Sequence, residues 1–276
     1  DNVGSIQNRG IEFLIDGIIT NSNNFNWNAN FNINFNRNKV LQLNDKQDII
    51  IGNKIIREGW DMNTWYLRKW AGVNPENGDP LWEKVRVDEN GNRMVEITNN
   101  YSSATLQNVG TSSPEFFGGF TNQFQYKNVS VTANFNFVSG NKIYNYYREL
   151  FDNDGAYPGY NSMKLDEGWN RWEKPGDEAT HPKTVLQGNK LSNKVSSRYL
   201  EDGSFIRLRQ LTVAANLPET FLKQLNIKES VIRLSGENLF TLTGFSGMDP
   251  EVGVEGNSGA FFPVTRKYMV GLDISF

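Results

Sequence analysis

The sequence predicts an all-β fold and, within that class, a transmembrane antiparallel β-barrel. Two observations lead to this prediction: strand-like segments alternate between apolar and polar residues, and their connections are short and long in turn. Alternation places successive side chains on opposite sides of a strand, so each segment has one apolar face. That face must be covered, either by a second sheet or by lipid.

The clearest strand spans residues 25–36, FNWNANFNINFN. Its odd positions are all apolar and its even positions are all asparagine. Leaving its large side chains in water would forfeit roughly 1.5–3 kcal/mol each, so the apolar face must be buried. Residues 21–36 carry no charge, whereas solvent-facing sides of soluble strands usually carry Lys and Glu. This favours lipid as the cover, with a soluble or surface-attached β-sandwich binding module as the chief alternative.

Six further segments are predicted to be strands with the same two faces. The first precedes the NSNN turn at 21–24, and the next two flank a tight YKN turn. In the fourth, the apolar residues change from even to odd positions after Leu208. A β-bulge or the end of a buried band would explain this change of parity. The segments are residues 3–19, 115–126, 129–138, 204–216, 231–242 and 264–276.

The connections between these strands favour a membrane barrel over a compact soluble domain. Structureless loops beyond ~15 residues are uncommon in compact domains. Outer-membrane barrels instead combine short periplasmic turns with long extracellular loops. Long extracellular loops are therefore predicted near residues 40–114, 139–202 and 243–263.

Following the strand directions places the C-terminus in the periplasm. A complete bacterial barrel has an even number of strands and both termini in the periplasm, whereas the seven predicted strands begin outside. We therefore expect residues 1–276 to be the C-terminal segment of a single, larger β-barrel domain.

Composition excludes several other classes of protein. The 276 residues are 38% hydrophobic and 13% aromatic, which excludes global disorder. A net charge of −3 without a basic cluster predicts no nucleic-acid partner. No run approaches the ~18 apolar residues of a spanning helix. The chain has no cysteine, which excludes metal–thiolate chemistry, and we predict no cofactor.

Catalytic and metal-binding residues are not predicted. His181 is the single histidine and lies in a long link, where we expect it to be solvated. The run VDENGNR at 87–93 lacks the closing glutamate of a calcium loop and predicts a hairpin turn, and DNDG at 152–155 is an equally weak calcium signal. An outer-membrane enzyme on a smaller barrel is a third possibility, depending on His181 or on a carboxylate pair such as Asp166 and Glu167.

Several stretches, taken in order, resemble the SusC/RagA-type TonB-dependent transporters of Bacteroidetes outer membranes. The closest resemblance lies near the end of the chain, in stretches such as RLSGENLFTLTGFSGMDPEVG and FPVTRKYMVGLDISF. The resembling stretches are residues 2–13, 37–43, 126–137, 171–177, 199–227, 233–253 and 262–276.

This resemblance implies a barrel of about 22 strands, closed by an N-terminal plug that is absent from this chain. It also implies import of oligosaccharides or peptides, together with a SusD-like surface lipoprotein that captures the ligand. Transport would draw on the TonB complex of the inner membrane, which acts on the plug. Outer-membrane lipid would surround the wall of the barrel.

Aromatic residues in the long links are candidates for contact with the ligand or with the partner lipoprotein. Planar rings suit stacking on sugars or gripping a peptide, although they could equally form a loop core or the interfacial aromatic girdle. The candidates are Trp60, Trp65, Tyr66, Trp82, Tyr144, Tyr147, Trp169 and Trp172.

Two further sets of candidates lie within the predicted strands. Arg207, Arg209, Arg233 and Glu237 are expected to face the lumen or the plug. The last stretch ends in an aromatic residue, which resembles the signal that the barrel assembly machinery recognises. That signal comprises Tyr268, Val270, Leu272, Ile274 and Phe276.

Overall fold

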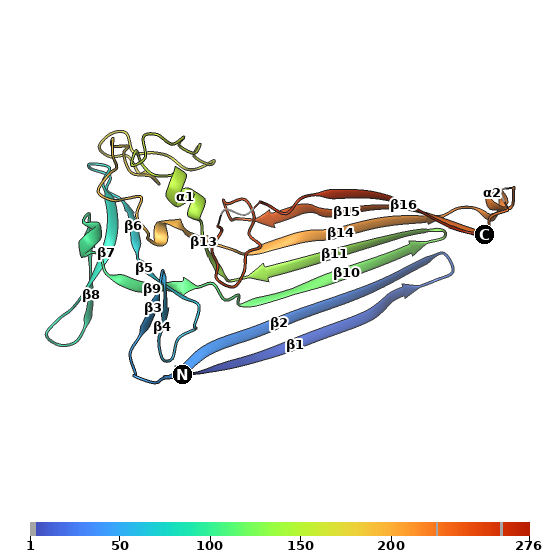
Figure 1. Ribbon diagram of the computed structural model, residues 1–276, viewed down its shortest axis with the longest axis horizontal. Helices are drawn as coiled ribbons and strands as arrows, with labels where there is room; N and C mark the ends of the chain where they lie inside the picture. The colour runs from blue at the N-terminus through green and yellow to red at the C-terminus, as the bar shows by residue number, and fades with distance from the viewer. Residues whose placement is uncertain (1–3, 225, 260–261) are drawn as a thin grey trace.

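The computed structural model describes residues 4–224, 226–259 and 262–276. Its main feature is a seven-stranded antiparallel sheet with the order β1-β2-β10-β11-β14-β15-β16 (Figure 1). All seven predicted strands are present, and each pairs with the next one along the chain. They are β1 (Gly4–Asn21), β2 (Phe25–Leu43), β10 (Phe116–Tyr126), β11 (Val129–Ser139), β14 (Phe205–Asn216), β15 (Glu229–Thr243) and β16 (Lys267–Ser275).

The pairing register collects the apolar residues on one face of this sheet. Phe120 on β10 lies opposite both Phe31 on β2 and Phe135 on β11, and Phe135 lies opposite Leu208 on β14. Rings from neighbouring strands stack along this face, with centroids 4.4 Å apart for Phe120 and Phe135 and 6.1 Å apart for Phe31 and Phe137. The asparagines of β2 share the opposite, polar face. The predicted two-faced sheet is therefore confirmed.

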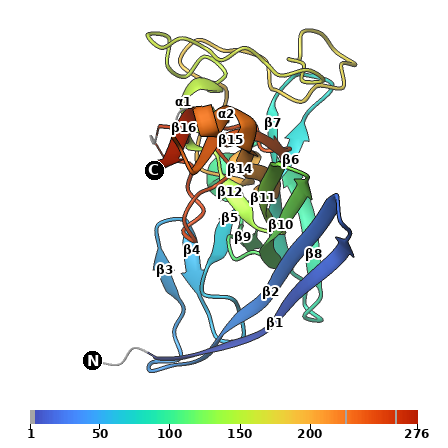
Figure 2. The same cartoon turned by 90° about the vertical axis from the view of Figure 1, so that its right-hand side faces the viewer.

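No second sheet covers the apolar face within the described ranges. The smaller sheets gather beyond one end of the long sheet (Figure 1), which is a curved, open wall with β1 and β16 at its edges (Figure 2). Large side chains on the face stay exposed, including Phe31 at 37%, Leu234 at 54% and Val270 at 79%. A sandwich would bury such residues against a second layer. The sandwich alternative is therefore wrong, and the sheet has the architecture of a membrane-barrel wall.

The parity switch in β14 is a β-bulge. The register of β14 against β11 shifts between Asn134 and Phe135, which pair with Gln210 and Leu208 and leave Arg209 as the extra residue. Because of this shift, Leu208 faces the same side as Leu211. A single inserted residue thus keeps the apolar face continuous.

The long links contain small sheets and short helices, although residues 152–196 form no helix or named strand. They gather at one end of the long sheet, whereas the β1–β2 and β10–β11 turns and the end of β16 lie at the other (Figure 1). We call residues 44–115, 140–204 and 244–259 the loop region. None of the helices in the described residues is both long and apolar enough to cross a bilayer.

The loop region contains three small sheets, with orders β3-β4-β5-β9, β6-β7-β8 and β12-β13. Their strands are β3 (Ile49–Ile51), β4 (Lys54–Ile56), β5 (Thr64–Arg68), β6 (Trp70–Val73), β7 (Pro80–Val87), β8 (Arg93–Thr98), β9 (Leu106–Thr111), β12 (Lys142–Tyr144) and β13 (Leu200–Asp202). The helices are η1 (Tyr101–Ser103), α1 (Tyr146–Phe151) and η2 (Ser197–Tyr199), and α2 (Glu219–Gln224) lies in the link between β14 and β15.

Candidate functional site in the loop region and on the polar face

The polar face of the long sheet carries three of the four predicted strand residues. Arg207 lies opposite Asn136, and Glu237 lies opposite Gln210. Arg233 also falls on this face by register. Arg209 is the bulge residue of β14 in its pairing with β11.

Arg207 fastens the last part of the loop region to the wall. Its guanidinium donates to the hydroxyl of Thr241 at 2.8 Å and to the carboxylates of Glu251 at 2.7 Å and Asp249 at 2.6 Å. Only 4% of the Arg207 side chain is exposed, so these bonds are shielded from water. Arg209 pairs with the same Glu251. The two arginines therefore tie the segment after β15 to β14.

Arg233 and Glu237 make exposed ion pairs instead. Arg233 lies 2.9 Å from Asp273, and both side chains are more than half exposed. Lys267 lies 3.5 Å from Glu237. Exposed pairs of this kind contribute about 0–1 kcal/mol, so these residues leave the polar face charged without bracing it.

Three of the predicted ligand-binding rings form the interior of the loop region. Trp65, Tyr144 and Trp82 are 1%, 2% and 0% exposed. Trp65 packs on Tyr144 with ring centroids 6.0 Å apart, and Tyr144 packs on Tyr199 at 6.2 Å. Burial and the nearby carboxylate of Glu149 raise the pKa of Tyr144 far above its usual value, so its hydroxyl donates a hydrogen bond to that carboxylate at 2.5 Å. In this structure these three rings are packing residues, because they have no surface to offer a ligand.

The other five predicted rings are half-buried and keep part of their surface accessible. Arg57 lies 4.4 Å above the Trp60 ring and 5.9 Å above the Tyr66 ring. Tyr147 stacks on Phe151 at 6.5 Å. These rings are supported on one side and open on the other, which suits contact with a ligand or partner.

Trp169 and Trp172 belong to the same half-buried group. Arg148 lies 4.2 Å from the centre of the Trp169 ring. Trp172 donates to the carbonyl of Pro75 at 2.8 Å. It packs directly on Gly78, where φ is +71° and a Cβ would lie 2.5 Å from the ring. Glycine is therefore required at this position.

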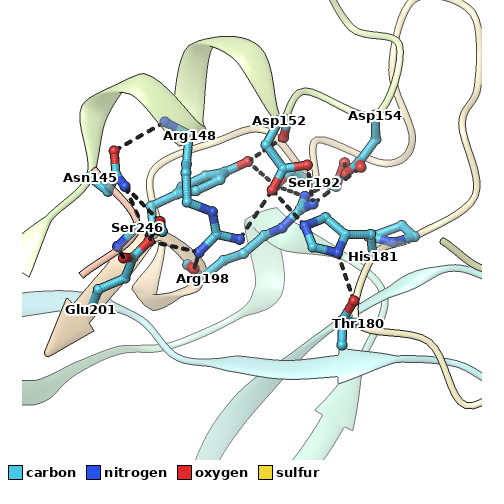
Figure 3. Close-up of polar contacts among 12 residues, drawn as sticks. Asn145, Arg148, Asp152, Asp154, Thr180, His181, Ser192, Arg198, Glu201 and Ser246 are labelled. Atoms are coloured by element: carbon cyan, nitrogen blue, oxygen red, sulfur yellow. Dashed lines mark hydrogen bonds and ion pairs between the residues drawn. The ribbon is translucent and has the colours of Figure 1, made fainter. Parts of the chain in front are cut away.

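The long link after β12 is held by a buried ionic cluster (Figure 3). Asp152 and Asp154 have fully buried side chains. Arg198 donates to Asp152 at 3.2 Å and to Asp154 at 3.1 Å, and Arg148 donates to Asp152 at 3.1 Å. Arg171 reaches Asp154 at 2.6 Å. We call these five residues, together with His181, the ionic cluster.

The cluster compensates the cost of burying its carboxylates. Burial alone would raise the pKa of Asp152, but the hydrogen bond from His181 and the charges of Arg198 and Arg148 outweigh it and hold the pKa well below its usual range. Removing one partner of such a buried pair typically costs about 3–5 kcal/mol, because the remaining charge is left uncompensated. The cluster therefore fixes the conformation of the link between β12 and β13.

His181 belongs to this cluster, so the prediction that it is solvated is wrong. It is 1% exposed, and its Nε2 donates to Asp152 at 2.9 Å. Its Nδ1 lies 2.8 Å from the hydroxyl of Thr180. Both ring nitrogens are thus engaged in hydrogen bonds within the loop region.

Neither weak calcium signal marks a metal site. The carboxylates of Asp152 and Asp154 are occupied by arginines. Asp88 accepts from the backbone of Asn90 and Asn92 in the turn between β7 and β8, where Gly91 has φ +83°. The predicted hairpin turn is confirmed. Across residues 4–224, 226–259 and 262–276, no group of three or more His, Asp or Glu side chains could hold a metal ion.

Comparison with known proteins identifies relatives that match over the whole chain, although no family model matches. TonB-dependent receptor P3 of Formosa agariphila is 28% identical over 100% of the chain, which covers 29% of that protein. TonB-dependent receptor SusC of Bacteroides thetaiotaomicron is 24% identical over 100% of the chain, which covers 27% of that protein.

Solved structures show the same similarity. The RagAB peptide transporter matches with a TM-score of 0.85 and 27% identity over 100% of the chain, which covers 30% of that structure's chain. The RagAB peptide importer in its open-open state matches with a TM-score of 0.81 and 25% identity. The chain thus spans less than a third of the length of these relatives. They are named as receptors and transporters rather than as enzymes.

Proposed function

Because the chain is a barrel segment of the SusC/RagA type of TonB-dependent outer-membrane transporter, we propose that it serves in the import of oligosaccharides or peptides. In this proposal the long sheet is part of the barrel wall, and the loop region shapes the mouth. A SusD-like lipoprotein would bind over that mouth, and the TonB complex would supply energy through a plug domain.

The observation that carries this proposal is the single-layered sheet with an exposed apolar face. Val270 and Leu272 on β16 remain 79% and 58% exposed, and no other layer covers them within the described residues. Such a face is stable when lipid covers it. Both edge strands also present unpaired backbone groups, which hydrocarbon does not tolerate. We therefore propose that further strands pair with β1 and β16 and close the barrel.

The direction of the wall follows from its two unlike ends. Outer-membrane barrels place short turns in the periplasm and long loops outside. We accordingly place the loop region outside the cell and the end of β16 in the periplasm. The five half-buried rings would then contact the ligand or the lipoprotein: Trp60, Tyr66, Tyr147, Trp169 and Trp172.

The last strand would also carry the signal for barrel assembly. Four of its apolar side chains share the lipid-facing side, as the register of β16 with β15 indicates. Their exposed fractions are 75% for Tyr268, 79% for Val270, 58% for Leu272 and 43% for Ile274, and Phe276 follows at 77%. An exposed row of this kind is available to an assembly factor before the wall closes.

A two-part experiment tests the proposal. The complete protein should stay in the membrane pellet after carbonate washing and should require detergent to remain monodisperse. Deleting its gene should abolish growth on a complex glycan or peptide source that the wild type uses, and a strain without TonB should show the same defect. Release into buffer without detergent, or unchanged growth on every such source, would refute the proposal.

A further inference from the structure

A cavity of about 520 Å³ lies where the long sheet meets the loop region. Strands β2, β10 and β11 contribute Asn36, Phe117 and Val138 from the polar face, and the loop region contributes Met62 and Val254. This volume falls within the roughly 300–1,000 Å³ of typical ligand pockets. The cavity is therefore large enough for a small ligand or for one part of a longer one.

The lining combines amide and hydroxyl groups with apolar side chains and, among the described residues, contains no charged one. Two charged residues lie behind it, but both are already bound: Lys54 donates to Ser112, and Asp61 accepts from Ser113 at 3.0 Å. A charged ligand would lose its hydration here without gaining a counter-charge. A neutral ligand rich in hydroxyl groups would meet donors, acceptors and apolar contacts.

Asn141 provides a second, independent observation. It follows β11, lines the same cavity and is 7% exposed. Its side-chain Oδ1 has no hydrogen-bond partner among the described residues. Buried polar groups are almost always satisfied, so an unpaired amide at a cavity wall indicates a missing partner. This oxygen is itself enclosed in the structure, so a ligand hydroxyl would supply the partner after the Asn141 amide turns towards the cavity.

We propose that this cavity is a binding subsite for a neutral oligosaccharide, an inference that rests on the import function proposed above. Sugar hydroxyls would pair with the amides of Asn36 and Asn141, and the C–H faces of the pyranose ring would lie against Phe117 and Val138. A peptide is the less favoured occupant, because charged termini and side chains would find no counter-charge in the lining.

A printed array tests this assignment with the complete transporter in detergent. The array carries neutral oligosaccharides, uronic-acid oligosaccharides and peptides capped at both ends. We expect binding to neutral oligosaccharides, and we expect Asn141→Leu to weaken it by about tenfold, the factor that one lost hydrogen bond produces. Asn36→Leu, at an exposed position that cannot harm the core, should weaken it in the same direction.

Asn28→Leu is the matched control, because Asn28 lies on the same face of β2 as Asn36 but outside the cavity. It should bind like the wild type. Binding that survives both cavity variants would overturn the site, and binding only to capped peptides, only to charged sugars or to nothing would overturn the ligand class. TonB-dependent growth, measured in parallel, shows whether the transporter itself works, so failure of the subsite is distinguishable from failure of the proposed function.

Discussion

The long sheet and the loop region achieve stability in opposite ways. The sheet leaves its apolar side chains exposed, as at Val270 and Phe31, while the charged pair of Arg233 and Asp273 on its polar face is a weak surface pair. The loop region buries the rings of Trp65, Trp82 and Tyr144 and also buries charges, with Asp152 and Asp154 paired to arginines. The sheet thus depends on a surrounding medium, whereas the loop region supplies its own interior.

Lipid therefore has to cover the apolar face of the sheet, whereas contacts within the chain stabilise the loop region. A wall in hydrocarbon needs only correct parity, because every outward side chain meets the same medium. A loop region above the membrane must meet water on its surface, so its rigidity comes from particular long-range pairs. Substitutions that break the parity of the wall should therefore damage the sheet and spare the loop region. Substitutions that remove a long-range pair should do the reverse.

Breaking the ionic cluster should give the largest effect. We expect Asp152→Ala to cost the loop region about 3–5 kcal/mol, because buried arginines lose their counter-charge. Hydrogen exchange of residues 145–199 should accelerate while β10 and β11 keep their protection. The matched control is Asp48→Ala, which removes a more exposed pair with Arg57 and should cost no more than about 1 kcal/mol. Equal effects of the two substitutions would show that the cluster does not hold the link.

Placing a charge on the apolar face of β2 should give the next largest effect. Phe31→Lys puts a cation into the apolar face and should destabilise the barrel in a bilayer by about 2–4 kcal/mol. Asn30→Lys changes the neighbouring residue on the polar face, beside Asp16, and should change stability little. Unfolding of the complete protein in lipid vesicles measures both. Similar losses for the two variants would mean that lipid does not contact the Phe31 face.

Acid should loosen the loop region before it affects the sheet. The pKa of Asp152 is lowered in the fold, so its contribution to stability is complete above its ordinary pKa of 3.8 and is lost as the pH falls through the lower folded value. This loss should be smaller than that of Asp152→Ala, because a protonated carboxyl still accepts hydrogen bonds. Hydrogen exchange compared at pH 7 and in acid should show residues 145–199 opening first. Simultaneous opening of β10 and β11 would contradict the expectation.

The same contrast explains which features the sequence could predict. Strand parity is local, so all seven strands, the bulge in β14 and the face occupied by Arg207 follow from neighbouring residues. The turn at Asp88 also has a local signature. These features required no knowledge of which distant segments meet.

The loop region could not be predicted in this way, because its contacts are distant in sequence. His181 and Asp152 are 29 positions apart, and Arg198 reaches Asp154 across 44. Nothing in the residue type distinguishes Trp65, which is buried, from Trp60, which is half-buried. Asn141 gave no signal either, because an unpaired amide is defined by what surrounds it.

The smallest expected effect concerns Arg233 on the polar face. Its pair with Asp273 is more than half exposed, so Arg233→Met should cost the complete transporter no more than about 1 kcal/mol. The free energy of unfolding in detergent, measured beside Asp152→Ala, provides the scale. A loss comparable to that of Asp152→Ala would mean that another part of the complete protein covers this pair and removes it from water. The polar face at Arg233 would then be packed rather than open, and its charged pair would be buried like those of the loop region.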